Sequence, residues 1–113
     1  MQSEKQLQTI CVAWFRDTYK DYLIYSSLNG VKLTGGSKYA ILVEEIRLGM
    51  LKGVSDLLVC LPNGVTLNIE MKTLTGKQSK DQVAIEKTLK SLGHHYYLVR
   101  EFKEFKRVIN KHI

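Results

Sequence analysis

A tight turn followed by a strictly alternating segment constrains the fold of this chain more than any other feature. Pro62-Asn63-Gly64 has the composition of a hairpin turn, and apolar and polar residues alternate from Val65 to Lys72. Alternation with a period of two predicts a β-strand with one apolar and one polar face. The apolar face would carry Val65, Leu67, Ile69 and Met71, and the polar face Thr66, Asn68, Glu70 and Lys72. Glu70 and Lys72 should therefore project side by side.

The apolar run before the turn begins at Asp56 and predicts the first strand of this hairpin. When the two strands pair through the turn, Asp56 can lie beside Glu70 and Lys72. Two carboxylates and a lysine at a sheet edge have the composition of a site for a hard divalent cation. The alternatives are a solvated charge pair on the strand for Glu70 and Lys72, and ordinary turn chemistry for Asp56.

The remaining segments predict further helices and strands around this hairpin. Predicted helices cover residues 3–19, 37–48, 79–92 and the basic amphipathic tail from 101, and the other predicted strands cover 22–28 and 94–100. Ser3 and Ser37 are expected N-caps, and Ser79 with Gln82 has the spacing of a capping box. This order predicts an α/β fold in which a mixed β-sheet is flanked by helices.

Composition narrows the class of protein. A chain of 113 residues with 44% hydrophobic and 25% charged residues can bury its own core, so we expect one domain over residues 1–113. The net charge of +6 is compatible with a polyanionic partner.

Cys11 and Cys60 lie in apolar segments and are expected to be reduced packing residues. No secretory signal or bilayer-length apolar run is visible, so a cytoplasmic protein with no membrane partner is expected.

Hydrolysis of a phosphodiester bond needs a positioned water, charge relief on the phosphate and help for the leaving oxygen. A cation held by Asp56 and Glu70 could provide all three, with Mg²⁺ or Mn²⁺ as the expected cofactor. Lys72 could orient the water or stabilise the developing charge. The main-chain carbonyl of Met71 is a candidate for a further metal ligand.

The spaced motifs of the chain resemble those of the PD-(D/E)XK nuclease superfamily. They are Gly53-Val-Ser-Asp56, Asn68-Ile-Glu70-Met-Lys72 and Gly76-Lys-Gln-Ser79-Lys-Asp-Gln82. More narrowly, the chain resembles the VRR-NUC family, including its small stand-alone members found in phages. The resemblance implies a restriction-endonuclease-like core, metal ligation by Asp56 and Glu70, and catalysis by Lys72. Ser55 departs from the family pattern, which usually has Pro before the aspartate, but this departure removes no ligand.

The resemblance also implies roles for two residues on helices. Glu4 on the first helix would complete the metal site, and Gln82 on the third predicted helix would line it as a catalytic residue. Glu4 equally suits the positive end of its helix dipole, and Gln82 equally suits the capping box with Ser79. Glu44 and Glu45 are rival acids for the role of Glu4.

Several residues near these motifs are candidates for DNA contacts: Lys52, Lys77, Lys80 and Gln8. For the lysines, an ordinary solvated surface is the alternative. The resemblance implies a metal-dependent endodeoxyribonuclease that acts as a homodimer on branched DNA, as a four-way (Holliday) junction resolvase. Its gene could be that of a phage in a bacterial host or that of a bacterium. A flap nuclease, a non-catalytic DNA-binding module and an enzyme acting on small phosphoesters are the alternatives.

Overall fold

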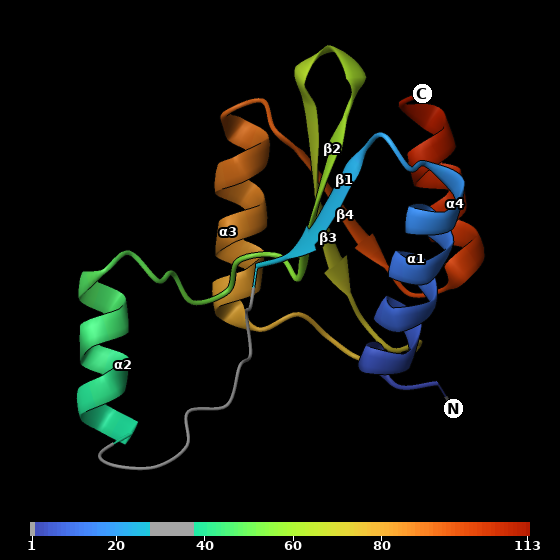
Figure 1. The fold of residues 1–113 in the computed structure, drawn as a ribbon. Helices are drawn as coiled ribbons and strands as arrows, with labels where there is room; N and C mark the ends of the chain where they lie inside the picture. Colours follow the sequence, from blue (N-terminus) through green and yellow to red (C-terminus); the bar gives the residue numbers. More distant parts are fainter. Residues whose placement is uncertain (1, 28–37) are drawn as a thin grey trace.

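The computed structural model describes residues 2–27 and 38–113, and one four-stranded sheet lies at its centre (Figure 1). The helices are α1 (Glu4–Thr18), α2 (Lys38–Arg47), α3 (Lys80–Ser91) and α4 (Phe102–Lys111). The strands are β1 (Leu23–Ser26), β2 (Leu57–Leu61), β3 (Val65–Met71) and β4 (His95–Val99). The predicted α/β class and the order of elements are confirmed, while residue 28 and the predicted cap Ser37 lie outside the described residues.

The sheet is mixed, with strand order β1-β2-β3-β4. β1, β2 and β3 are antiparallel neighbours, and β4 runs parallel to β3. The hairpin closes between Leu61 and Val65 through a short 3₁₀ turn, η1 (Pro62–Gly64). Asn63 and Gly64 both have positive φ angles there, 64° and 74°, which asparagine and glycine adopt more readily than other residues. The predicted hairpin is therefore confirmed together with its turn.

The hydrophobic core lies between the sheet and the helix pair α1 and α4. Figure 1 shows these two helices side by side on one side of the sheet and α3 on the other. The predicted inner face of β3 is confirmed, because Leu67, Ile69 and Met71 are fully buried. The helices contribute Leu7, Cys11 and Phe15 from α1, and Phe105 and Ile109 from α4. This packing leaves the other face of β3 to α3, where the polar residues lie.

Helix α2 stands apart from this body, as its green ribbon shows in Figure 1. None of its residues is buried. Tyr39, Leu42, Val43 and Ile46 are exposed apolar side chains, although they recur at the three- and four-residue spacing of a packed helix face. The described chain therefore offers no surface that covers this stripe.

The two cysteines are free, as predicted. Cys11 is fully buried in the core, and burial raises the pKa of its thiol, which keeps the thiol protonated. Cys60 is half-buried on β2. Among the described helices, none combines the length and the apolar character that crossing a bilayer requires.

Candidate active site

Asp56 and Glu70 meet at the open end of the hairpin. The last pair between β2 and β3 is Leu57 with Ile69, so the same register places Asp56 opposite Glu70, one position further on. Asp56 Oδ2 accepts a hydrogen bond of 2.7 Å from the Met71 N–H. In a β-strand the N–H and C=O of one residue point to the same side, so the Met71 carbonyl also faces the side of Asp56. The hairpin thus brings together the groups expected at this end.

Glu70 is buried, with 1% of its surface exposed, although it lies on the polar face of β3. Its Oε1 accepts a hydrogen bond of 2.9 Å from Gln82 Nε2 on α3. Its Oε2 lies 3.4 Å from the hydroxyl of Tyr96 on β4, which donates to it. The alternative of a solvated charge pair is therefore wrong for Glu70, because α3 and β4 cover this part of the strand.

Burial and the neighbouring Asp56 both disfavour the charged form of Glu70. Loss of hydration is the largest cause, followed by the hydrogen bond and the charge of Asp56, and together they raise the pKa of Glu70 to about 9. Lys72 and Tyr96 act in the opposite direction and do not offset them. At neutral pH and without a cation, Glu70 therefore retains its proton. A divalent cation bound by both carboxylates would replace that proton.

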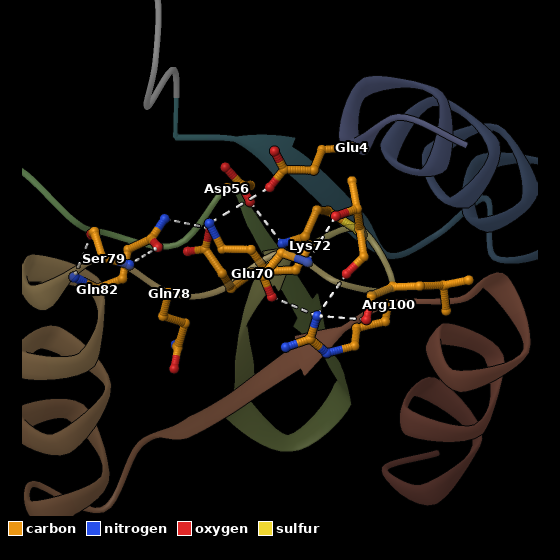
Figure 2. Close-up of polar contacts among 12 residues, drawn as sticks. Glu4, Asp56, Glu70, Lys72, Gln78, Ser79, Gln82 and Arg100 are labelled. Carbon is orange, nitrogen blue, oxygen red and sulfur yellow. Dashed lines mark hydrogen bonds and ion pairs between the residues drawn. The ribbon is translucent and has the colours of Figure 1, made fainter. Parts of the chain in front are cut away.

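Lys72 follows β3 directly, and its ammonium lies 3.7 Å from Glu4 Oε1 (Figure 2). The Lys72 side chain is 13% exposed and that of Glu4 48%, so the pair lies at the rim of the site. Glu4 is in the first turn of α1. Glu44 and Glu45 lie on α2, which stands apart from the sheet (Figure 1). The structure therefore places Glu4, and not the rival acids, beside Lys72.

Gln82 fulfils both of its expected contacts at once. Its Oε1 accepts a hydrogen bond of 2.8 Å from the Ser79 N–H, and Ser79 Oγ accepts one of 3.2 Å from the Gln82 N–H, which completes the capping box. The Nε2 of the same side chain remains available and donates to Glu70 (Figure 2). The two interpretations of Gln82 are therefore compatible, and its role in catalysis stays a prediction.

The polar residues behind Glu70 were not predicted from the sequence. Tyr96 is 4% exposed, and its hydroxyl accepts a hydrogen bond of 3.4 Å from Gln78 Nε2. Gln78 also donates to Glu86 Oε1 at 3.0 Å, and Glu86 pairs with Lys90 at 2.7 Å. Burial and the nearby Glu70 raise the pKa of Tyr96, so its hydroxyl remains a donor. The network connects the buried carboxylate to the surface of α3.

Ser55, which stands where the related motif usually has Pro, is itself buried. Its hydroxyl lies 3.4 Å from both the Leu57 carbonyl and Asn68 Oδ1. These contacts hold the residue before Asp56 by side-chain hydrogen bonds.

The donor groups at this edge match a hard divalent cation in type and charge. Asp56 and Glu70 offer carboxylate oxygens, and Met71 offers a main-chain carbonyl, which are the ligands that Mg²⁺ and Mn²⁺ prefer. Burial and Asp56 disfavour the charged form of Glu70 and raise its pKa, so a cation bound here would stabilise that form. Across residues 2–27 and 38–113, no group of three or more His, Cys, Asp or Glu side chains is preassembled for a metal, and Glu4 is held by Lys72.

The predicted DNA-contacting residues lie on α1, on α3 and in the loops before β2 and α3. Lys52 is 3.7 Å from Asp81 at the start of α3. Lys77 and Lys80 are exposed, in the loop before α3 and at its first residue. Gln8 is half-buried, one turn beyond Glu4 on α1. Their roles stay predictions.

The loop before Asp56 is anchored on α3 at Gly53. Its φ angle is 94°, and a Cβ at this position would lie 2.6 Å from the main-chain carbon of Asp81. Only glycine allows this approach without a shift of the backbone. Close contact at Gly53 therefore places Lys52 next to Asp81.

Comparisons with known proteins agree on the fold. No family model and no curated protein matches this chain. Among solved structures, one titled "VRR_NUC domain" is similar over the full length of both chains, with 22% identity and a TM-score of 0.67. Another, titled "VRR_NUC domain protein", has 18% identity and a TM-score of 0.73, and the match covers 96% of this chain and 86% of that one. The chain therefore has the fold of VRR_NUC domains.

Proposed function

We propose that this chain is a metal-dependent endodeoxyribonuclease of the VRR-NUC family that cuts branched DNA as a homodimer. The observation that carries the proposal is the pairing of Asp56 with the buried Glu70, with Lys72 two residues further along the chain. The fold shared with VRR_NUC domains supports the same assignment. Two charged carboxylates this close together, one of them buried, would destabilise the protein if nothing offset their charge. A bound cation would offset it, which gives the arrangement a physical reason.

Asp56 and Glu70 would hold Mg²⁺ or Mn²⁺, with the Met71 carbonyl as a further ligand. When bound, the cation would supply an activated water and charge relief on the scissile phosphate. Gln82 and Tyr96 keep the Glu70 carboxylate in one orientation through their hydrogen bonds. Orientation of a metal ligand by such contacts supports both affinity and activity.

Lys72 would stabilise the charge that develops on the phosphate or orient the attacking water. Its side chain is 13% exposed and follows the end of β3 directly, so little reorganisation is needed when charge develops. Glu4 would hold this ammonium before DNA binds and would contribute to the metal site. The first role follows from its contact with the ammonium at 3.7 Å, and the second is what the resemblance to the VRR-NUC family implies.

The surface charge favours a nucleic-acid substrate over a small phosphoester. The chain carries a net charge of +6, and Lys52, Lys77 and Lys80 are exposed, in the loop before Asp56, in the loop before α3 and at the first residue of α3. We propose that these lysines contact phosphates, with Gln8 facing the site from α1. Binding through phosphates would weaken as salt increases.

The exposed stripe of α2 supports the proposed homodimer. Tyr39, Leu42, Val43 and Ile46 form an apolar face that no described part of the chain covers. Such a face is typical of a protein–protein contact, and a twofold axis through it would bury the same surface on both copies. Two copies would provide two sites, as symmetric cutting of a four-way junction requires. The junction is therefore the proposed substrate.

Cleavage of matched four-way junction, flap, splayed-arm and linear duplex DNAs tests this function. We expect symmetric cutting of the junction with Mg²⁺ or Mn²⁺ and none with EDTA. Cutting of flaps alone would retain the active site and overturn the paired-site substrate. Salt-sensitive DNA binding without any cleavage would identify a non-catalytic DNA-binding module instead.

A further inference from the structure

Arg100 binds the loop that follows Lys72. Its Nη1 donates hydrogen bonds to the carbonyl oxygens of Thr73 at 2.6 Å and Gly76 at 2.7 Å, and lies 3.4 Å from that of Leu74 (Figure 2). Arg100 comes directly after β4, and β4 is parallel to β3. Both chain segments therefore leave the sheet at the same edge, which explains how residues so far apart in sequence meet.

The loop is a closed turn attached to the sheet on the side of Lys72. The Lys72 N–H donates to the carbonyl of Val99, the residue before Arg100, at 3.0 Å. The Gly76 N–H donates to Thr73 Oγ1 at 2.9 Å, and a Cβ on Gly76 would lie 2.8 Å from this oxygen. The carbonyl oxygens of this turn thus converge on one guanidinium group.

In the described part of the chain, the hydrogen bonds of the Arg100 guanidinium run from Nη1 to main-chain oxygens. Within it, no carboxylate lies at ion-pair distance from the guanidinium, and Glu104 instead accepts a hydrogen bond of 3.1 Å from the Arg100 N–H. Hydrogen bonds from a charged donor are stronger than those between neutral groups. Arg100 is half-buried, so water competes only partly for these contacts.

We propose that Arg100 is a positioning residue for Lys72. It holds residues 73–76 in one conformation, and this conformation sets the direction in which the chain leaves Lys72 and enters the capping box of Ser79 and Gln82. Arg100 itself does not contact the reacting atoms. The inference rests on the proposed nuclease function, because the effect of this positioning appears in the chemical step.

The test compares Arg100→Met, Arg100→Lys and a matched control, Arg16→Met. Arg16 also uses its side chain to bind a main-chain carbonyl, that of Ile24 at 3.1 Å, but it lies near the opposite end of α1 from Glu4. All variants would be examined by amide hydrogen exchange without metal and by single-turnover cleavage of a four-way junction with Mg²⁺. DNA affinity would be measured separately in Ca²⁺ by fluorescence anisotropy.

We expect Arg100→Met to accelerate exchange of the Gly76 amide by about 10-fold or more, because the turn opens locally. Its single-turnover rate at saturation should fall by roughly 10- to 100-fold, with DNA affinity within about 3-fold of the parent, since small misplacement of a catalytic group affects the rate strongly. Arg100→Lys should restore part of the rate by keeping a charged donor. Arg16→Met should change neither the exchange of Gly76 nor the rate.

Three results would overturn the inference. A parental cleavage rate in Arg100→Met, with or without faster exchange, would reduce Arg100 to a structural role. A loss of DNA affinity with an unchanged rate would make it a phosphate contact. If the parent protein cleaves none of the DNAs, the proposed function itself fails and the positioning role fails with it, while hydrogen exchange still shows whether Arg100 holds the loop.

Discussion

The side-chain nitrogen of Gln82 donates a hydrogen bond to the buried carboxylate of Glu70 at 2.9 Å. The oxygen of the same amide simultaneously accepts the Ser79 N–H at 2.8 Å. A residue of the capping box at the start of α3 is therefore also the residue that orients a proposed metal ligand. Changes that affect one function of this side chain can be separated from changes that affect the other.

Gln82→Glu separates the capping box from the contact with Glu70. Glutamate still accepts the Ser79 N–H, but it cannot donate to Glu70 and it adds a negative charge beside it. We expect the metal-free protein to lose about 1–3 kcal/mol of unfolding free energy near neutral pH, measured by urea denaturation. Gln6→Glu is the matched control, because Gln6 forms the same box with Ser3. Equal losses in both variants would show that the contact with Glu70 contributes nothing.

Glu70 should make the stability of the metal-free protein fall as pH rises. Its pKa is raised from 4.5 to about 9, so above pH 4.5 the unfolded chain releases a proton that the folded chain retains. The unfolded state then binds fewer protons, and the unfolding free energy declines until the pH passes about 9. Melting temperatures measured across this range should decline, and Glu70→Gln should remove this part of the decline. An identical slope in the variant would contradict the assignment.

Glu4→Gln should weaken activity and metal binding by roughly 10- to 100-fold, because it removes the carboxylate that contacts Lys72. Glu45→Gln on α2 is the control and should leave both unchanged. Metal binding can be followed by the increase in melting temperature with Mn²⁺. If Glu45→Gln rather than Glu4→Gln produced the loss, the rival acid of α2 would hold the role.

Ile46→Glu should separate the two copies of the proposed dimer. It places a charge in the exposed stripe of α2, where no residue is buried in the described chain, so the fold itself should persist. Light scattering at micromolar concentration should give twice the 13.0 kDa chain mass for the parent and a single chain mass for the variant. A parent that remains monomeric would count against junction cutting by paired sites.

The hairpin at the centre of the fold was predictable because its signals are local. Alternation along β3 and the Pro62-Asn63-Gly64 turn set the register, and this register alone places Asp56 opposite Glu70. The N-cap Ser3 and the capping box of Ser79 with Gln82 were predictable for the same reason, whereas the box that Gln6 completes with Ser3 was not predicted. Local patterns thus predicted the elements and the central residues of the site.

Burial of Glu70 could not be predicted, because the groups that cover it come from other parts of the chain. Gln82 and Tyr96 lie 12 and 26 residues away, and their approach depends on how α3 and β4 pack. Arg100 was missed for the same reason, although a basic residue at the end of a strand parallel to β3 could have indicated a contact near Lys72. The exposure of the apolar face of α2 could not be predicted either, because its apolar residues have the spacing of a helix that packs against a core.

The central claim is that Asp56 and Glu70 form the metal site of a nuclease. Cleavage by the Asp56→Asn variant tests this claim most directly. Four-way junction cleavage in Mg²⁺ and junction binding in Ca²⁺ would be measured for the parent, Asp56→Asn, Lys72→Ala and the control Asp17→Asn, an exposed acid on α1. We predict that Asp56→Asn abolishes cleavage while binding is retained, that Lys72→Ala slows cleavage by at least about 100-fold, and that Asp17→Asn matches the parent. Cleavage at the parental rate by Asp56→Asn would contradict a metal site built on Asp56 and Glu70.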